Sequence, residues 1–580
     1  MFYQIKSINT KFRIRFKNIN KKEEFLNANK KSKKLYQNEG EFIFIYGTAF
    51  YKGEKIENNL EEIFFALKYN KLCYEEIIKE IEGNYFLLIL INNKYFFWTD
   101  RYGVLKIYFY YNEDTLIISS LIYNIFKANP EFSINAFNLI EQGFQLVCLD
   151  NTTFLDKVFR MNIETLYIYT PKNLVAKKIK YSELDYSTYL FEKKIDILVE
   201  KLISKAKYVQ ENYKSIALNM TGGLDSRVIL AIYLSIGIKP TLLYGKGNSF
   251  ITNTHNEDLE IVKKIAQKYN LELEIMDWSI EEENLEKDWD NLLCQYGELY
   301  IKYGGNRKIF DFYRNSNFDF IEFGNYGEMF RNIPKLEKLP SKLTVEEAFS
   351  LYKFIDYETI GDHKLEIKKR LLKKMNLILG DDFPIDKVKY NKFDFYYSCM
   401  TDSSMINLVN YLEISCANLY TFCLDESKEF TYEEKKDKRI FVEILKRIDI
   451  NLLTEIEIFS GEKRIKYVKN KFVYSNFLER SKFIYKLYQV MKKYINKDFL
   501  MKINKILLKS SKSCKEMEKM KNLKSYIIKQ IEQKQIELGI NIIKIDFSFN
   551  GDERLLLYYY QYLYLISFIK KGVTDERFFL

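Results

Sequence analysis

The sequence predicts an α+β domain followed by an α/β domain with a parallel sheet and a helical C-terminal part. Up to about residue 125, short runs of β-forming residues are separated by turn signals, and two stretches between them have helical spacing. From about residue 190, buried strands alternate with amphipathic helices, the pattern of a parallel sheet with crossover helices. We expect three regions, at residues 1–190, 191–470 and 471–580.

Each expected element of the first region follows from a local pattern. Runs rich in aromatic and β-branched residues predict strands at 41–46, 85–90, 94–98 and 107–111. Apolar residues at helical spacing predict helices at 60–69 and 74–81. A sheet-layered α+β domain is the natural result.

In the second region, short buried runs alternate with longer amphipathic runs. The short runs predict strands at 215–220, 240–244, 271–275 and 318–323. The longer runs predict helices at 191–210, 224–236 and 257–269. Beyond about residue 345 the sequence predicts mostly helix, including a buried helix at 555–569 that is too short and too polar to span a membrane.

The net charge of +11 arises from 90 Lys and Arg residues against 79 Asp and Glu residues. Most lysines are interspersed with acids, so the charge does not favour nucleic acid as a partner. The stretch 463–524 is more basic, and we favour a solvated helical face there over a site for an anion or a membrane surface.

The seven Cys residues are scattered without a C-x-x-C pair, and the two His residues, His255 and His363, are isolated from each other. These patterns argue against a disulfide framework, a structural zinc site and His-based catalysis. The N-terminus lacks the apolar stretch of a signal peptide. We therefore expect a cytoplasmic protein with no membrane span.

The strongest chemical signal is the string Met220-Thr221-Gly222-Gly223-Leu224-Asp225-Ser226-Arg227, which lies between a predicted strand and a predicted helix. Two glycines let the main chain turn sharply and approach a ligand closely. The N–H groups at the helix start attract phosphate. The hydroxyls of Thr221 and Ser226 can donate to phosphate oxygens, and Asp225 can hold a Mg²⁺ ion that bridges the phosphates. The string is not a Walker A loop, because the G-K-[ST] ending is absent.

Thr221-Gly222-Gly223-Leu224-Asp225-Ser226 resembles the S-G-G-x-D-S pyrophosphatase loop (PP-loop) of asparagine synthetase, β-lactam synthetase and lasso-peptide cyclases. The resemblance implies that this loop binds the triphosphate of ATP and that chemistry occurs at the α-phosphate, with release of pyrophosphate. It also implies that Leu218, Leu243 and Tyr244 contact the adenosine.

A second string, Gly324-Asn325-Tyr326-Gly327-Glu328-Met329-Phe330-Arg331, resembles the S-G-E-G-x-D-E loop of the same family. The acids of that loop hold the Mg²⁺–pyrophosphate, so the resemblance implies nucleotide binding at Gly324 and metal binding by Asp225 and Glu328. Only one acid of the motif is present here. A single carboxylate, together with phosphates and waters, can still satisfy Mg²⁺.

A weaker resemblance covers 410–439, which echoes the E-x-R…P-F-L-D…K-x-x-x-R region of the family without its Arg and Pro. In the family, a Lys on a following flexible loop stabilises the adenylating transition state. Lys463 is the implied catalytic residue, and Lys466 is a second candidate. The alternative is that both lysines are simply solvated.

In the first region, Gly83-Asn84-Tyr85-Phe86 and Asp100-Arg101-Tyr102-Gly103 resemble the class II glutamine amidotransferase domain of asparagine synthetase, an Ntn-hydrolase-like β-sandwich. That domain uses an N-terminal Cys thiolate as its nucleophile. Here Phe2 follows the initiating Met, and the first Cys is Cys73. We therefore expect a degenerate domain that does not hydrolyse glutamine and has a structural role.

Together these features predict an ATP-dependent, AMP-forming ligase that adenylates a carboxylate and forms an amide bond without hydrolysing glutamine. Its expected partners are ATP, Mg²⁺, a small-molecule or peptide carboxylate and an amine donor, and a homodimer is possible. Two alternatives stay open. One is a catalytically impaired ATP-binding or regulatory protein of the same fold, and the other is a PP-loop enzyme that modifies RNA through the basic C-terminal region.

Overall fold

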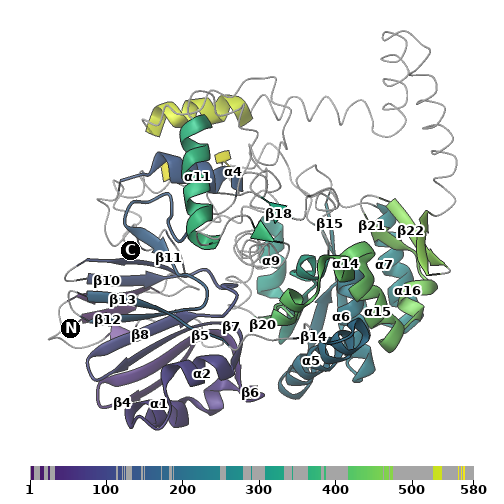
Figure 1. Ribbon diagram of the computed structural model, residues 1–580, viewed down its shortest axis with the longest axis horizontal. Helices are drawn as coiled ribbons and strands as arrows, with labels where there is room; N and C mark the ends of the chain where they lie inside the picture. Colours follow the sequence, from purple (N-terminus) through teal and green to yellow (C-terminus); the bar gives the residue numbers. More distant parts are fainter. Residues whose placement is uncertain are drawn as a thin grey trace.

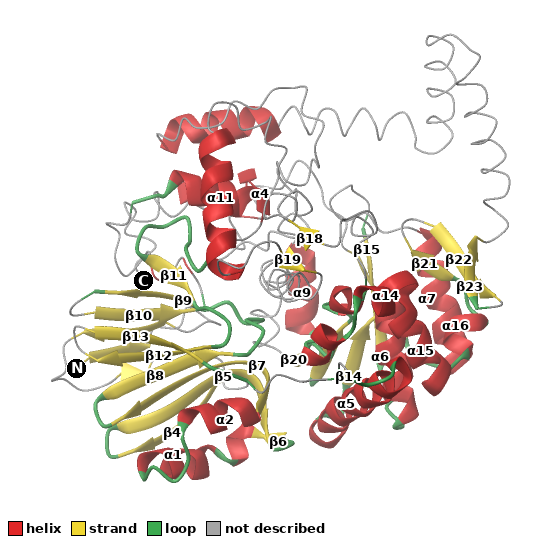
Figure 2. Ribbon diagram, in the orientation of Figure 1, coloured by secondary structure: helices red, strands yellow, loops and turns green. Residues whose placement is uncertain are grey.

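The computed structural model contains a body built on two β-sheets and a second body built on a parallel sheet, as Figure 1 and Figure 2 show. It describes residues 2–5, 13–17, 24–25, 33–277, 307–331, 342–343, 364–379, 385–386, 416–474 and 527–538, with gaps inside some of these ranges and a few isolated residues besides. His255, His363 and most of the basic stretch at 463–524 lie outside the described residues.

The N-terminal body contains two largely antiparallel sheets, as predicted. The first has the strand order β11-β9-β10-β2-β1-β3, and the second has the order β13-β12-β8-β7-β5-β4 with β6 paired to β5. The first sheet consists of β1 (Phe2–Ile5), β2 (Arg13–Lys17), β3 (Glu24–Phe25), β9 (Tyr108–Tyr111), β10 (Thr115–Ser119) and β11 (Val158–Arg160). The second consists of β4 (Lys33–Asn38), β5 (Glu41–Tyr51), β6 (Glu54–Lys55), β7 (Ile81–Ile91), β8 (Lys94–Thr99), β12 (Thr165–Thr170) and β13 (Asn173–Lys178).

The long strands β5 and β7 form the centre of the N-terminal core. They pair antiparallel along their whole length, from Phe42↔Leu90 to Tyr51↔Ile81, and nearly all their residues are buried. Such continuous apolar runs are expected where both faces of a sheet are covered. Helix α1 (Leu60–Lys68) packs on β4 and β5, and α2 (Tyr74–Glu80) packs on β7. A further helix, α4 (Ala136–Gln145), follows later in the chain.

The second body is built on a parallel sheet with the strand order β16-β15-β14-β17-β20, which confirms the α/β prediction. Its strands are β14 (Ile216–Asn219), β15 (Thr241–Lys246), β16 (Leu273–Asp277), β17 (Phe320–Phe323) and β20 (Ala417–Leu419). The chain runs outward from β14 through β15 to β16, and then returns to the other side of β14 for β17. The order therefore reverses at β14, which makes this strand a topological switch point.

Helices surround the parallel sheet close to the predicted positions. Helices α5 (Phe191–Asn212), α6 (Leu224–Ser235) and α15 (Arg439–Ile448) pack on one another. Helix α7 (Asn256–Tyr269) packs on β15, and α9 (Arg307–Asn315) packs on β16. Apolar residues recur along α5 at the positions that are buried, and this period is the reason that its bounds could be predicted.

The expectation of mostly helix beyond residue 345 is only partly correct for the described residues. Helices there include α11 (Lys364–Leu379), α14 (Tyr432–Lys435) and α16 (Asn451–Thr454). The strands are β19 (Ile385–Asp386), which pairs with β18 (Lys342–Leu343), then β20, and a small sheet of β21 (Ile458–Ser460), β22 (Lys463–Val468) and β23 (Lys471–Tyr474). The β22–β23 hairpin runs across residue 470, so the predicted boundary at 470 falls inside a paired element.

Buried polar side chains join the two bodies at β20. The side-chain amide of Asn84 in β7 donates to Oδ1 of Asn418 at 2.9 Å, and the Asn418 N–H donates to Thr48 Oγ1 at 3.2 Å. Arg101 forms an ion pair with Asp425 of the second body. Asn84 and Arg101 belong to the two strings that resemble a glutaminase, so these positions here hold the bodies together.

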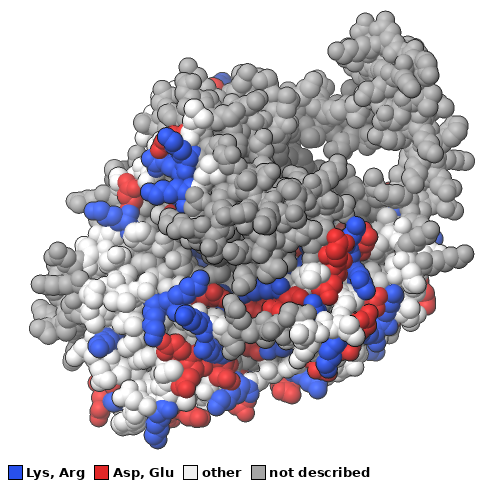
Figure 3. All heavy atoms as spheres, in the orientation of Figure 1, with Lys and Arg blue, Asp and Glu red and all other residues white. Residues whose placement is uncertain are grey.

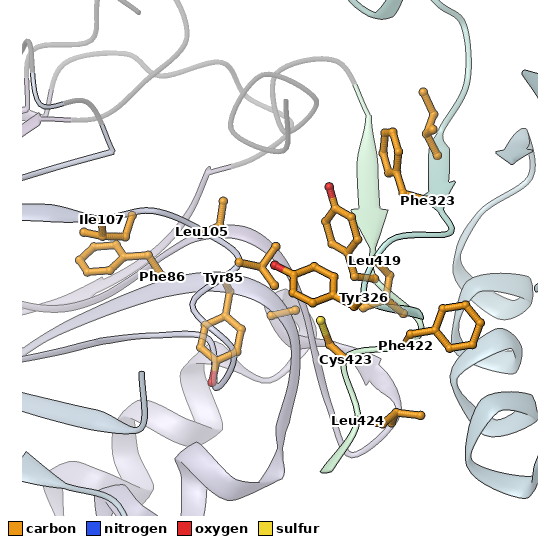
Figure 4. Close-up of a cluster of buried hydrophobic side chains, with 14 of the residues drawn as sticks. Tyr85, Phe86, Leu105, Ile107, Phe323, Tyr326, Leu419, Phe422, Cys423 and Leu424 are labelled. Carbon is orange, nitrogen blue, oxygen red and sulfur yellow. The ribbon is translucent and has the colours of Figure 1, made fainter. Parts of the chain in front are cut away.

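Apolar packing completes this junction. Figure 4 shows a buried cluster to which both bodies contribute side chains. Its labelled members are Tyr85, Phe86, Leu105, Ile107, Phe323, Tyr326, Leu419, Phe422, Cys423 and Leu424. Burial of this kind contributes roughly 25 cal/mol per Å² of apolar surface, so the contact between the bodies is part of the core.

Among the described residues on the face seen in Figure 3, groups of Lys and Arg lie beside groups of Asp and Glu. This agrees with the interspersed pattern in the sequence. Within the described ranges, no helix combines the length and the apolar character needed to cross a membrane.

Candidate active site

Two loops meet at the carboxyl ends of β14 and β17, the neighbouring strands at the switch point. The first loop, residues 220–223, leads from β14 into α6, and we call it the diglycine loop. The second loop, residues 324–331, follows β17 and contains the 3-10 turn η4 (Gly327–Phe330). Open parallel sheets bind ligands at this kind of position.

The hydroxyl of Ser226 fixes the shape of the diglycine loop. Thr221 N–H donates to Ser226 Oγ at 3.1 Å, and Ser226 Oγ lies 3.1 Å from the Thr221 carbonyl oxygen. Ser226 is buried, whereas Thr221 is exposed. Of the two hydroxyls predicted to donate to phosphate, Thr221 therefore faces solvent and Ser226 has a structural role in this conformation.

Gly222 lies where three segments approach one another closely. Its N–H donates to Asp258 Oδ1 at 2.6 Å, and its carbonyl oxygen accepts from Phe459 N–H at 2.9 Å. A Cβ atom at this position would lie 2.5 Å from Asp258 Oδ1 and 3.0 Å from Phe459 Cβ, so only glycine fits. A Cβ atom at Gly223 would meet only Thr221 Oγ1, at 3.2 Å. The open side of the bend is thus at Gly223, directly before the first N–H groups of α6.

Behind the loop, the buried guanidinium of Arg227 ties the bend to a later part of the chain. Nη1 donates to the carbonyl oxygens of Leu452 and Ile456 at 2.7 and 3.1 Å. Nη2 donates to the carbonyl oxygen of Gly222 at 3.0 Å and to that of Glu457. Arg227 is therefore committed to main-chain carbonyls, and it supports the loop from the side away from a ligand.

The second loop brings Glu328 and Arg331 to Asp225. Arg331 Nη2 lies 2.9 Å from Asp225 Oδ2 and 2.8 Å from Glu328 Oε1. Gly327 makes this approach possible, because a Cβ atom there would lie 2.7 Å from Asp225 Cγ. The structure therefore brings the two predicted metal ligands together, and it places one guanidinium between them.

A half-buried lysine completes this group of charges. Lys438, which directly precedes α15, and Asp437 both have left-handed main-chain conformations, with φ of 58° and 53°. Such conformations cost energy in residues other than glycine, and they concentrate at functional sites. Burial lowers the pKa of Lys438 to about 8, with a further lowering from Arg331 and an opposing effect from Asp225. Burial also raises the pKa of Asp225 to about 6, against the opposing charges of Arg331 and Lys438.

A magnesium ion fits this group of residues through Asp225. The Oδ1 atom of Asp225 is buried and has no hydrogen-bond partner, whereas its other oxygen and one oxygen of Glu328 are paired with Arg331. Across the part of the chain that the structure describes, no group of three or more His, Cys, Asp or Glu side chains could hold a metal ion. A bound Mg²⁺ would therefore take most of its ligands from phosphates and water.

The predicted adenosine contacts lie within the parallel sheet. Leu218, Leu243 and Tyr244 are each at most 2% exposed. Contact with adenosine would therefore have to come from their main-chain atoms, and this role stays a prediction. Gly324 packs directly on the diglycine loop, since a Cβ atom there would lie 3.2 Å from the Ser226 nitrogen.

Lys463 is close to the diglycine loop in the fold, although its side chain lies outside the described residues. It pairs with Ser460 of β21, the strand whose Phe459 N–H is bonded to Gly222. Its catalytic role stays a prediction. Lys466 is exposed and lies 3.9 Å from a carboxylate oxygen of Glu457.

Sequence reasoning missed a buried carboxyl group beneath the site. Glu322 of β17 accepts hydrogen bonds from the N–H and hydroxyl of Thr421, at 3.1 and 2.9 Å, and from the hydroxyl of Tyr233, at 3.1 Å. It thereby joins β17 to α6 and to the segment after β20. Burial raises the pKa of Glu322 to about 7 despite these hydrogen bonds. Arg331 and Lys438 were also missed as site residues, although both fall in strings that resemble family motifs.

A cavity of about 580 Å³ lies beside the edge strand β16, where residues of α9 and of the following segment line it, among them Met276, Lys308 and Phe318. Its lining does not include the diglycine loop. The diglycine loop, at the carboxyl end of the central strand β14, is therefore separate from this cavity.

No protein-family model matches the chain. Over 160 residues the chain is 31% identical to tRNA-specific 2-thiouridylase MnmA 1 of Bacteroides thetaiotaomicron, an overlap that covers 25% of this chain and 43% of that protein. The chain has relatives in the adenine nucleotide α-hydrolase (PP-loop) superfamily. Over 81 residues it is 36% identical to tRNA-specific 2-thiouridylase MnmA 2 of Bacteroides fragilis, covering 13% of this chain and 21% of that PP-loop protein. The chain thus spans less than half the length of these curated relatives.

Two solved structures give weak overlaps. NMN synthetase from Francisella tularensis aligns with 33% of this chain and 92% of its own, at 14% identity and a TM-score of 0.18. Glutamine phosphoribosylpyrophosphate amidotransferase from B. subtilis aligns with 42% of this chain and 72% of its own, at 8% identity and a TM-score of 0.18. Overlaps this slight add nothing to the argument, so the description of the second body rests on its strand order and on the position of its loops.

The raised pKa of Glu322 predicts a pH-dependent stability. The folded pKa of about 7 exceeds the ordinary value of 4.5, so the folded state binds the proton more tightly than the unfolded chain. The free energy of unfolding should therefore fall as the pH rises from about 4.5 to 7. Glu322→Gln should remove this part of the fall, so the variant should gain stability relative to the parent between pH 5 and pH 8. Urea unfolding at both pH values measures this, with the exposed Glu328→Gln as control. Parallel stability curves for the parent and Glu322→Gln would contradict the assignment.

Proposed function

We propose that this chain is an ATP-dependent, AMP-forming ligase that adenylates a substrate carboxylate and joins it to an amine. The observation that carries the proposal is the open side of the diglycine loop. Gly223 leaves space directly before α6 at the switch point of the sheet, and a helix start in this position attracts phosphate. Similarity to the PP-loop superfamily supports ATP as the phosphate compound.

In the proposed first step, a carboxylate oxygen of the substrate attacks the α-phosphorus of ATP. The bond from that phosphorus to the β-phosphate oxygen breaks, and pyrophosphate leaves. In the second step, an amine attacks the acyl carbon, the bond to AMP breaks, and the amine loses a proton to solvent. Positioning and charge stabilisation supply most of the rate in such reactions, because little covalent chemistry is left for the protein.

The charges of the first step match the residues around the diglycine loop. Negative charge moves onto the leaving pyrophosphate. The N–H groups at the start of α6 follow the loop directly, and the amine of Lys438 interacts electrostatically with Asp225 in the first turn of that helix. Asp225 would hold Mg²⁺ through Oδ1, and Glu328 would be the second acid when its ion pair with Arg331 opens. The ion, when bound, neutralises part of the phosphate charge.

The N-terminal body supports a ligase that does not hydrolyse glutamine. Asn84 and Arg101 are used for contacts with the second body. We propose that this body is structural and that the nitrogen comes from an amine in solution or on the substrate.

The most direct functional prediction concerns Asp225. Asp225→Ala should lower carboxylate-dependent pyrophosphate release by about 100-fold or more, because the proposed ligand of Mg²⁺ is lost. A coupled pyrophosphate assay over a panel of carboxylates measures this, with Asp449→Ala as a control acid away from the loop. Equal activity of Asp225→Ala and the parent would show that the loop assignment is wrong. Nucleotide binding without turnover on any carboxylate would favour the regulatory alternative.

Lys438 gives a second prediction, based on the pH profile. Its pKa of about 8 means that the amine loses its charge as the pH rises through 8. If the charged amine stabilises the leaving pyrophosphate, the rate of pyrophosphate release should fall across this range. Lys438→Arg should keep its rate to higher pH, because a guanidinium stays charged. Lys438→Met should be slow at every pH, whereas Lys446→Met should match the parent. A parent profile that is flat from pH 7 to 9.5 would exclude this role, and Lys463→Met in the same assay tests the other candidate lysine.

The similarity to tRNA-specific 2-thiouridylases favours a second candidate function, an enzyme that uses ATP to modify a nucleotide of RNA. Such an enzyme would bind tRNA with an affinity that falls steeply with salt, because phosphate contacts release counterions. Filter binding of tRNA at low and moderate salt, with pyrophosphate release measured in the presence of tRNA, separates the two candidates. Release that depends on tRNA and not on a carboxylate would replace the ligase proposal.

A further inference from the structure

We propose that Arg331 is a permanent cation of the polyphosphate site and that its guanidinium contacts pyrophosphate directly. Pyrophosphate binding should therefore depend less on Mg²⁺ than it would at a site where two acids face each other with no basic residue between them. The inference rests on the proposed function in that it places the polyphosphate at the diglycine loop. It adds a residue that the family motif does not supply.

The first support is the position of the guanidinium. Arg331 Nη2 is within 2.9 Å of Asp225 Oδ2 and 2.8 Å of Glu328 Oε1, the two carboxylates that the sequence marks as metal ligands. A metal ion shared by these two oxygens would have to displace the guanidinium. In the folded chain as described, the charge that bridges the two acids is therefore supplied by the protein.

The second support is the balance of charge. Asp225 and Glu328 carry two negative charges, and Arg331 and Lys438 carry two positive charges when ionised. A divalent ion added between the same acids would lie close to both cations, and like charges at short range repel one another. One partnerless oxygen, Asp225 Oδ1, is left for a metal ion. The charges of these four side chains thus balance without a metal ion between the two acids. The two cations can bind an anion when phosphate replaces an acid as their partner.

The third support is the exposure of the acids that pair with Arg331. The Glu328 side chain is 56% exposed, whereas the side chains of Arg331 and Asp225 are 27% and 21% exposed. An exposed ion pair contributes little to stability, so phosphate can replace Glu328 as the partner of Arg331 at small cost. Guanidinium groups bind phosphate oxygens through two parallel hydrogen bonds, which makes this exchange favourable. Arg331 would then keep Asp225 on one side and hold pyrophosphate on the other.

The test is pyrophosphate binding with and without metal, measured by calorimetry on the full chain. In EDTA the parent should retain binding within about tenfold of its affinity in Mg²⁺. Arg331→Gln should bind at least about tenfold more weakly than the parent in EDTA and should recover most of the difference in Mg²⁺. Arg331→Lys should lie between the two, because an ammonium lacks the paired donors.

Arg447→Gln is the matched control, because Arg447 has a similar exposure, 26%, and is also paired with two acids, Asp196 and Glu443. It should bind pyrophosphate as the parent does, and thermal unfolding should show that both Gln variants are folded. Equal binding by the parent and Arg331→Gln in EDTA overturns the inference, as does a parent that binds pyrophosphate only with Mg²⁺.

The binding test of Arg331 can fail or succeed independently of the activity test of the proposed ligase function. If Arg331 supports metal-free binding but no carboxylate elicits pyrophosphate release, the ligase proposal fails and this inference stands. If release occurs but Arg331→Gln binds pyrophosphate normally in EDTA, the inference fails and the ligase proposal stands.

Discussion

The candidate site depends on two loops that approach each other more closely than side chains would allow. Gly324 and Gly327 of the second loop lie at the contact points, where a Cβ atom would come within 3.2 Å of the Ser226 nitrogen and within 2.7 Å of Asp225 Cγ, respectively. Because these collisions are absent, Asp225 lies between the loops, with its Oδ1 atom buried and its Oδ2 atom within reach of Arg331. The raised pKa of Asp225 and the charge balance around it both follow from this close packing.

The parallel sheet sets this geometry, and the N-terminal body supports it from β20. Asn418 of β20 is bonded to the N-terminal body through Asn84 and Thr48, and Glu322 of the adjacent strand reaches the segment after β20. The N-terminal body therefore contributes to the position of the strands beneath the site.

Much of the fold could be predicted because its signals are local. The period of α5 and the apolar run of β7 appear directly in the sequence, and the diglycine loop is marked by a strand before it and a helix after it. The cluster of Arg331 and Lys438 could not be predicted, since those residues are far apart in the chain and meet only through the strand order. The hairpin at β22–β23 was missed because its lysines suggested a solvated helical face, whereas their alternation with apolar residues is a strand pattern.

The central claim is that the open side of the diglycine loop binds the phosphates of a nucleotide. A crystal structure with a non-hydrolysable ATP analogue tests this most directly. The account predicts phosphate oxygens within hydrogen-bonding distance of the N–H groups at Gly223 and the start of α6, beyond the carboxyl end of β14. An analogue bound at another place, with Gly223 covered by protein, would contradict it.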